Sequence, residues 1–289
     1  LKDHHTDKAI LIARALKGGK GRACMVGDRA SDMKGAHQNG IDAIGAGYGY
    51  TRPGELEGAG ARYVAASVQE LADYLLEGEE VCPGFFISFE GSDGCGKTTQ
   101  LRAAADWFAE RGYETVVTRE PGGSPVAERI RELVLDVKSE GMTPRCEALL
   151  FAAARAEHVA WVIEPGISRG AVVLTDRYVD SSIAFQGAGR ELGMELIREI
   201  NQPAIQGRMP DMTLFFEVDP MQAIARRRGD SAPDRLEQED ERFIQRTYLG
   251  FRQLAAQSPD RIRSVDASRP VDEVRDQVRK HLMDLVVRA

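Results

Sequence analysis

The chain has 289 residues, which is long for one domain and comfortable for two. Its hydrophobic fraction of 43% suits a packed core, and its net charge of −7 argues against broad nucleic-acid binding, which usually needs a basic face. No stretch approaches the roughly 20 uninterrupted apolar residues of a membrane span, and the N-terminus lacks the apolar core of a signal peptide. We therefore expect a cytoplasmic protein without nucleic-acid or membrane partners.

The first clear pattern in the chain is a short apolar run with two acidic residues. Residues 22–28 predict a buried strand that ends in Asp28, and Asp32 follows four positions later. Two carboxylates at the carboxyl end of a strand could hold Mg²⁺, which prefers oxygen ligands. Alternatively, Asp28 caps the helix that is predicted through Met33 and Ala36.

Several motifs accompany this pair, namely Gly27-Asp28-Arg29, Asn39-Gly40-Ile41, the glycine-rich residues 44–49, and residues 67–71. Together they resemble the C-terminal half of phosphatases of the haloacid dehalogenase (HAD) superfamily, over about residues 4–76. The resemblance implies a small Rossmann-like α/β fragment in which Asp28 and Asp32 help to hold Mg²⁺. It also implies a lysine that stabilises the phosphorylated intermediate, for which Lys8 is the best candidate.

The nucleophile of that family is the first Asp of a D-x-D-x-[TV] strand, and this pattern occurs nowhere in the sequence. A covalent intermediate cannot form without the nucleophile. We therefore expect the segment alone to be inactive, as the tail of a phosphatase whose front half lies before Leu1 or has been lost. Residues 77–84 are charged and contain Gly and Pro, so we expect a domain boundary near Glu80, with domains at 1–80 and 81–289.

A phosphate-binding loop is predicted directly after the apolar strand 85–89. Residues 91–98 fit G-x-x-x-x-G-K-[ST], and the glycines let backbone N–H groups and a helix N-terminus converge on phosphate oxygens. Lys97 would add positive charge at the β- and γ-phosphates, and the Thr98 hydroxyl would ligate Mg²⁺. The residues expected to bind ATP are Gly91, Ser92, Asp93, Gly94, Cys95, Gly96, Lys97, Thr98 and Thr99.

The rest of the chain alternates strands and helices. Further strands are predicted at residues 114–118, 171–175, 212–217 and 262–266. Together with residues 85–89 they imply a five-stranded, doubly wound parallel sheet of the P-loop NTP hydrolase type, flanked by helices. Arg119 and Asp176-Arg177 follow strands at their carboxyl ends, where ligands bind in such sheets.

Motifs over about residues 84–286 look like thymidylate kinase in order and spacing. They are Phe89-Glu90-Gly91 with the phosphate loop, Thr118-Arg119-Glu120-Pro121-Gly122-Gly123, Leu149-Leu150-Phe151 with Arg155, Asp176-Arg177-Tyr178, Phe185-Gln186-Gly187, and Asp234-Arg235-Leu236-Glu237. The resemblance implies transfer of the γ-phosphoryl group of ATP, with Mg²⁺, to deoxythymidine monophosphate (dTMP), and it implies a homodimer.

The resemblance also implies roles for residues in the acceptor site. Asp93 would bond the 3′-hydroxyl of dTMP and help with the metal, and Arg119 would grip the dTMP phosphate. Phe151 would stack on thymine and Arg155 would meet the edge of the base, since a spacing of four places both on one helical face. Ser181, Ser182 and Gln186 fall where the family closes over the nucleoside, and Gln186 is the better candidate for a polar contact.

Catalysis would need positive charge on the migrating phosphoryl group. Arg177 would reach that group, and Asp176 would orient it or a metal-bound water. The charged segment of residues 226–235 is predicted as a lid, from which Arg228 and Arg235 would act, whereas Arg226 and Arg227 would belong to a solvated helix face. Alternative interpretations are another nucleoside monophosphate kinase, a non-catalytic nucleotide-binding module, or one part of a bifunctional phosphatase and kinase.

Overall fold

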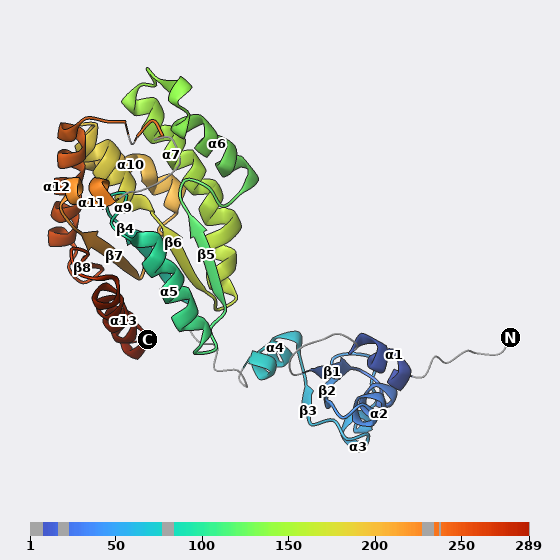
Figure 1. Ribbon diagram of the computed structural model, residues 1–289. Coiled ribbons are helices and arrows are strands. Elements are labelled where there is room, and N and C mark those ends of the chain that lie inside the picture. Colours follow the sequence, from blue (N-terminus) through green and yellow to red (C-terminus); the bar gives the residue numbers. More distant parts are fainter. Residues whose placement is uncertain (1–7, 17–22, 77–83, 227–233, 237, 289) are drawn as a thin grey trace. The chain divides into compact units, whose positions relative to one another are not determined.

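The computed structural model describes residues 8–16, 23–76, 84–226, 234–236 and 238–288. The chain divides into two compact units, Leu1–Val81 and Cys82–Ala289 (Figure 1). The boundary predicted near Glu80 lies outside the described residues, as do Arg227 and Arg228. Among the described helices, none has the length and apolar character that a membrane span requires.

The N-terminal unit contains a small parallel sheet. Its strands are β1 (Cys24–Gly27), β2 (Asp42–Ala46) and β3 (Tyr63–Ala65), in the order β1-β2-β3, and its helices are α1 (Lys8–Ala15), α2 (Ala30–Gln38), α3 (Glu55–Gly58) and α4 (Val68–Leu76). Met33, Ala36, Ala43 and Leu56 form a small core. The strand predicted as buried was wrong in that respect, because β1 lies at the edge of this sheet and its residues alternate between exposed and half-buried.

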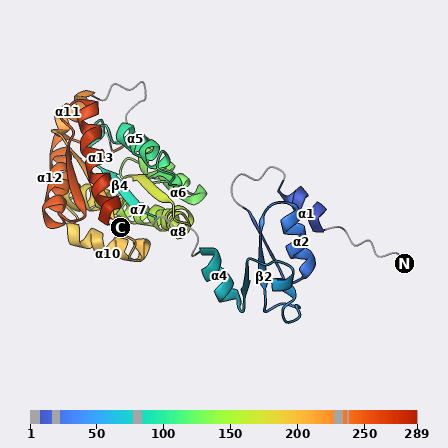
Figure 2. The same ribbon diagram turned by 90° about the horizontal axis from the view of Figure 1, so that it is seen from below.

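The C-terminal unit contains the five predicted strands, all parallel. They are β4 (Phe86–Glu90), β5 (Thr115–Arg119), β6 (Val172–Asp176), β7 (Met212–Glu217) and β8 (Ile262–Asp266), in the order β5-β6-β4-β7-β8. Helices cover both faces of this sheet (Figure 1, Figure 2). The predicted fold class is therefore confirmed.

Three long helices of this unit begin where the sequence offers a capping side chain. Ser124, Thr143 and Asp240 each accept a hydrogen bond from a backbone N–H in the first turn of α6, α7 and α12. The helical elements are α5 (Lys97–Ala109), α6 (Pro125–Leu135), η1 (Val137–Ser139), α7 (Pro144–His158), the π-helical η2 (Val159–Ile163), α8 (Glu164–Ser168), α9 (Val179–Ser182), the π-helical η3 (Ile183–Gly189), α10 (Met194–Ile205), α11 (Pro220–Arg226), α12 (Glu241–Gln257) and α13 (Val271–Arg288).

The sheet has a core on each face, because successive side chains of a strand point to opposite sides. Ile87 and Phe89 of β4 join a cluster with residues of α5 and α13. Phe86, from the same strand, joins a second cluster with residues of α7, α10 and α12. Burial on both faces explains why the central strands are nearly continuous apolar runs in the sequence.

The strand order places the carboxyl ends of β4, β5 and β6 at one edge of the sheet. From β4 the chain passes to β5 at one side, and from β6 it crosses to β7 on the other side of β4. Ligands of open parallel sheets bind where the strand order reverses in this way. The segments that follow these three strands are therefore expected to form the site.

Candidate active site

The phosphate loop joins β4 to α5. Gly91, Gly94 and Gly96 have φ angles of +138°, +81° and +94°, a region that glycine adopts without strain. A Cβ on Gly91 would lie 2.8 Å from the carbonyl oxygen of Phe216, so the loop needs glycine there for space as well. The buried Lys97 Nζ donates hydrogen bonds to the carbonyls of Gly91, at 3.1 Å, and Ser92, at 2.9 Å. The ammonium group is thus held across the loop.

The first turn of α5 meets the carboxyl end of β6. The Thr98 hydroxyl donates to Asp176 Oδ2 at 3.1 Å. Both groups offer oxygen, which is the ligand that Mg²⁺ prefers, and Mg²⁺ at nucleotide sites commonly uses one or two protein carboxylates together with phosphates and water. Within the described part of the chain, no group of three or more His, Cys, Asp or Glu side chains could hold a metal ion by itself. The residues present fit such a shared magnesium site.

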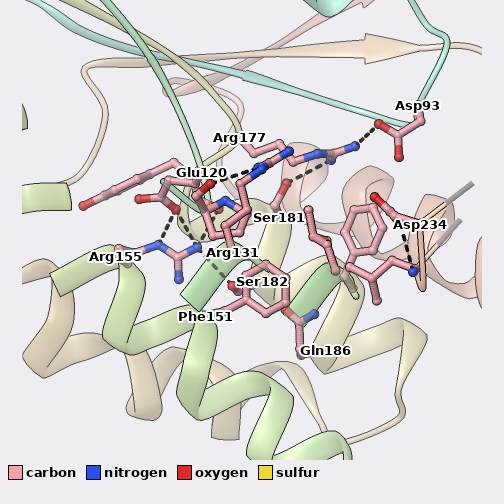
Figure 3. A pocket seen from close by; sticks show the side chains of 15 residues that line it. Asp93, Glu120, Arg131, Phe151, Arg155, Arg177, Ser181, Ser182, Gln186 and Asp234 are labelled. Carbon is pink, nitrogen blue, oxygen red and sulfur yellow. Dashed lines mark hydrogen bonds and ion pairs between the residues drawn. The ribbon is translucent and has the colours of Figure 1, made fainter. Parts of the chain in front are cut away.

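Arg177 follows β6 and reaches back to the phosphate loop. Its guanidinium donates to the carbonyl of Gly91 at 3.0 Å. It also donates to the Ser181 hydroxyl at 3.1 Å and to Asp93 Oδ1 at 2.7 Å (Figure 3). Its backbone has a φ of +72°, which is uncommon for a residue with a side chain. Burial acts to lower the pKa of Arg177, but the charges of Asp93, Asp176 and Glu90 outweigh it and raise that pKa. The group is therefore a permanent cation at the loop.

Glu90, the last residue of β4, is a fully buried carboxylate that the sequence analysis did not select as a site residue. It accepts hydrogen bonds from the Ser88 hydroxyl at 2.9 Å, the backbone N–H of Tyr178 at 2.7 Å and the Ser181 hydroxyl at 2.5 Å. Burial, with the nearby charge of Asp180, raises the pKa of Glu90 to about 7. The position of Glu90 directly before the phosphate loop could have indicated a site residue. The sequence of a strand end does not, however, predict which groups bond its side chain.

A cavity of about 140 Å³ opens beside Arg177. Seven of the predicted acceptor-site residues line it, and Figure 3 shows their side chains gathered around one space. These residues are Asp93, Phe151, Arg155, Arg177, Ser181, Ser182 and Gln186. The lining also includes Glu120, Arg131 and Asp234, which the sequence analysis did not assign to the site.

Arg155 of α7 is buried and already has several partners. It donates to Glu120 Oε2 at 2.8 Å, to the Ser182 hydroxyl at 3.0 Å and to the carbonyl of Tyr178 at 3.2 Å, and it also bonds Asn201. These acceptors use most of the five N–H donors of the guanidinium. Its contact with a base edge remains a prediction.

Arg119 and Arg131 lie close to each other near the cavity. Arg119 stands at the end of β5, is half exposed at 52% and donates to Glu128 at 2.9 Å. It is not among the described residues that line the cavity, whereas Arg131 is. Burial lowers the pKa of Arg131, and the charge of Arg119 lowers it further. Arg131 sits in a charged helix, and nothing in its spacing indicated a ligand.

Comparison with known proteins agrees with this geometry. The family model for thymidylate kinase matches residues 89–278. The thymidylate kinase of Exiguobacterium sp. is 44% identical over 195 residues, which cover 68% of this chain and 92% of that protein. The thymidylate kinase of Clavibacter michiganensis is 48% identical over 206 residues, covering 70% of this chain and 96% of the relative. The chain belongs to the thymidylate kinase family.

A solved structure shows the same relationship. The crystal structure of thymidylate kinase from Ehrlichia chaffeensis matches with a TM-score of 0.58 and 33% identity, over 70% of this chain and 99% of that chain. The resemblance predicted from the motifs of the C-terminal unit is therefore confirmed. The C-terminal unit, Cys82–Ala289, is thus the thymidylate kinase unit of the chain.

Two arginines near the predicted lid of the thymidylate kinase unit bond groups outside the phosphate loop, but Arg226 lies beside that loop, since it lines a cavity together with Gly94 and Gly96. Arg235 donates to the carbonyl of Val134 at 2.9 Å and to the buried Glu147 at 2.7 Å. Arg226 is exposed, as expected, but it also donates to the carbonyls of Ala267, at 2.6 Å, and Ser268, at 3.2 Å. The catalytic role of Arg235 remains a prediction.

The N-terminal unit matches the HAD-hydrolase-like family model over residues 8–71, which confirms the second predicted resemblance. Lys8 Nζ lies 2.9 Å from Oδ1 of the buried Asp32, and Asp28 Oδ2 accepts a hydrogen bond from the N–H of Tyr50 at 2.9 Å. The alternative that Asp28 caps α2 was wrong, because the N-cap is Arg29. Both carboxylates offer oxygen ligands that fit Mg²⁺.

Proposed function

We propose that the thymidylate kinase unit transfers the γ-phosphoryl group of ATP to dTMP, giving ADP and thymidine diphosphate. The observation that carries this proposal is that Lys97, Arg177 and the cavity containing Phe151 meet at one edge of the sheet, although they come from separate segments. A phosphate loop next to a cavity with one aromatic side and a cationic end suits two nucleotides whose phosphates face each other.

The protein would act mainly by positioning and by neutralising charge. The acceptor phosphate of dTMP is itself the nucleophile, so no general base is required. Lys97, held across the loop, and Arg177, which stays cationic, would stabilise the migrating phosphoryl group. Arg119 and Arg131 would bind the dTMP phosphate, and Asp93 would face its 3′-hydroxyl. A lid arginine, Arg228 or Arg235, would add a further positive charge beside the migrating phosphoryl group.

Mg²⁺ would be held by Thr98 and Asp176, with Asp93 nearby, and would neutralise charge between the phosphates of ATP. The oxygen-only donor set supports this assignment. EDTA is expected to abolish turnover and excess Mg²⁺ to restore it. Unchanged turnover after chelation would contradict the metal requirement.

The direct test is Lys97→Ala, assayed with ATP and with dTMP, dCMP and AMP as acceptors. We expect the wild type to use dTMP best, and the variant to lose turnover by about 100-fold or more, as removal of one transition-state donor commonly does. Lys138→Ala, at an exposed lysine of η1, is the control and should keep full activity. A folded Lys97→Ala variant with activity near that of the wild type would favour a non-catalytic nucleotide-binding module.

Equal rates with all three acceptors would instead favour a nucleoside monophosphate kinase without thymine preference. In that case the phosphoryl-transfer chemistry would stand and the assignment of the substrate would fall. The circular-dichroism spectrum of each variant shows whether it has stayed folded.

We propose that the N-terminal unit has no phosphatase activity by itself, because the sequence contains no D-x-D-x-[TV] nucleophile. Incubating the chain with a small phosphate ester tests this. Robust hydrolysis that Asp28→Asn abolishes would overturn the proposal and would favour a bifunctional phosphatase and kinase. A vestigial Mg²⁺ site at Asp28 and Asp32 remains compatible with an inactive unit.

We also propose a homodimer and a cytoplasmic location. Large apolar side chains on α6, α7 and the following π-helical turn are exposed, and burial in a partner would remove them from water. These side chains are Val126, Leu133, Leu149 and Trp161. Sedimentation of the wild type and of Leu149→Glu tests the dimer, which the charged variant should weaken.

A further inference from the structure

Glu147 is a carboxylate without exposed surface in the first turn of α7. Three side chains donate hydrogen bonds to it. Gln186 Nε2 lies 2.9 Å from Oε1, Arg190 Nη2 lies 3.0 Å from Oε2, and Arg235 Nη2 lies 2.7 Å from Oε2. A buried acid with this many partners fixes the orientation of each of them.

Glu147 can only accept hydrogen bonds while it is ionised. Burial acts to raise the pKa of Glu147, but the hydrogen bonds from Arg190, Gln186 and Arg235 outweigh burial, and the pKa is lowered. The carboxylate is therefore ionised at neutral pH. Since it needs a donor from each neighbour, Gln186 must turn its NH₂ group toward Glu147, and the amide cannot be reversed at low cost.

The other end of the Gln186 amide is a carbonyl oxygen. Gln186 lines the cavity and lies next to Phe151, on which a base is expected to stack (Figure 3). Among the described residues, none donates a hydrogen bond to Gln186 Oε1, because the only bond of this side chain runs from Nε2 to Glu147. The site thus offers a bound base an acceptor whose orientation is fixed.

Pyrimidine bases differ in what they present to such an acceptor. Thymine and uracil carry a hydrogen on ring nitrogen N3, whereas cytosine has a lone pair there. We propose that Glu147 is a positioning residue that sets the base preference, because it holds Gln186 so that Oε1 accepts the N3–H of thymine and repels the N3 lone pair of cytosine. This inference rests on the proposed function and extends it to a residue that does not line the cavity.

The test is Glu147→Gln, assayed for kcat/KM with dTMP, dUMP and dCMP. Arg190 Nη2 and Arg235 Nη2 both donate to Oε2, at 3.0 and 2.7 Å, so the oxygen of the introduced amide would take that position. Its NH₂ group would then face Gln186, at the cost of the longer bond of 3.2 Å from Arg190 Nε to Oε1. Gln186 would then turn around and present its own NH₂ group to the base. We expect the dTMP/dCMP ratio of kcat/KM to fall by about 10-fold or more, mainly through KM, as expected for a mismatched hydrogen bond in a binding site.

The dTMP/dUMP ratio is the internal control, because both bases carry N3–H, and it should not change. Arg190→Gln is the matched structural control. It removes donors from Glu147 but leaves the bond between Glu147 and Gln186, so it should lower stability while keeping the dTMP/dCMP ratio. A fall of that ratio in Arg190→Gln equal to the fall in Glu147→Gln would show that Glu147 acts only through packing, and would overturn the proposal.

Gln186→Met provides a second test that does not depend on the folding of Glu147→Gln. It removes the amide but keeps the length of the side chain, and we expect a similar fall in the dTMP/dCMP ratio. An unchanged ratio in active Gln186→Met, or in active Glu147→Gln, would overturn this inference alone. A wild-type chain that phosphorylates none of the three monophosphates would overturn the proposed function instead.

Discussion

The buried ion pair of Glu120 and Arg155 should be a large single contribution to the stability of the thymidylate kinase unit, and Glu120→Ala tests it. Arg155 Nη2 lies 2.7 Å from Glu120 Oε2, and the two side chains are only 1% and 3% exposed. Removal of Glu120 leaves the guanidinium buried without its counter-charge. His158, whose Nδ1 lies 2.9 Å from Glu120 Oε1, loses a partner as well.

Breaking a buried pair from one side commonly costs about 3–5 kcal/mol. That is a substantial share of the roughly 5–15 kcal/mol by which a folded domain is stable. The pair of Glu114 and Arg169 offers a matched control, because its N···O distance is also 2.7 Å but its side chains are 56% and 47% exposed. Water solvates such a pair in both states, so Glu114→Ala should cost about 1 kcal/mol or less.

Urea unfolding followed by tryptophan fluorescence measures both variants. The two tryptophans of the chain, Trp107 and Trp161, both belong to the thymidylate kinase unit, so the signal is not affected by the N-terminal unit. We expect the free energy of unfolding to be lower by several kcal/mol in Glu120→Ala than in Glu114→Ala. Losses that agree within about 1 kcal/mol would refute the argument that burial, and not distance, determines the strength of the pair.

Two further predictions concern Glu90 and the glycines. The pKa of Glu90 is raised from 4.5 to about 7, so the native state holds this proton more tightly than the unfolded state. The resulting stability is full below pH 4.5 and is lost as the pH rises through 7, by on the order of 3 kcal/mol. Urea unfolding between pH 4.5 and 8 should show this decline in the wild type and not in Glu90→Gln, and equal slopes would refute it. Gly123→Ala would bring a Cβ within 2.6 Å of His158 Cδ2, whereas Gly141 has a similar positive φ and no atom within 4 Å of such a Cβ. In thermal unfolding, Gly123→Ala should therefore lower the free energy of unfolding by about 1–3 kcal/mol more than Gly141→Ala does. Equal losses of stability in the two variants would count against the steric argument.

The sequence was sufficient for those parts of the fold that depend on local pattern. Apolar runs marked all five strands of the thymidylate kinase unit, and the glycine spacing of residues 91–96 marked the loop whose positive φ angles need glycine. The order β5-β6-β4-β7-β8 did not follow from the pattern, because pairing of parallel strands depends on crossovers over long segments. The exposed character of β1 was missed for the same reason, since an edge strand and a central strand can have similar sequences.

The sequence predicted those residues of the candidate site that belong to recognisable motifs. Asp93, Phe151, Arg177 and Gln186 belong to motifs of known spacing, and they line one cavity. Arg131 lines the same cavity from a charged helix face, and no spacing rule separates it from its neighbours. The apolar pattern of an amphipathic helix predicts which face is buried. It does not predict which polar side chains beside that face line a cavity, because that depends on how the helix packs against other segments.

The residues that hold the site in shape were the hardest to predict, and they share a chemical type. Glu90, Glu120 and Glu147 are buried carboxylates from three different elements, and each bonds a side chain that lines the cavity. A buried carboxylate is costly unless donors surround it, so each of them persists only because the tertiary fold supplies those donors. In the sequence, Glu90 and Glu120 stand inside the quoted motifs and Glu147 in a predicted helix, but no spacing shows which side chains they bond. Sequence patterns therefore favour the groups that touch a ligand, whereas the groups that orient them emerge only when distant segments pack together.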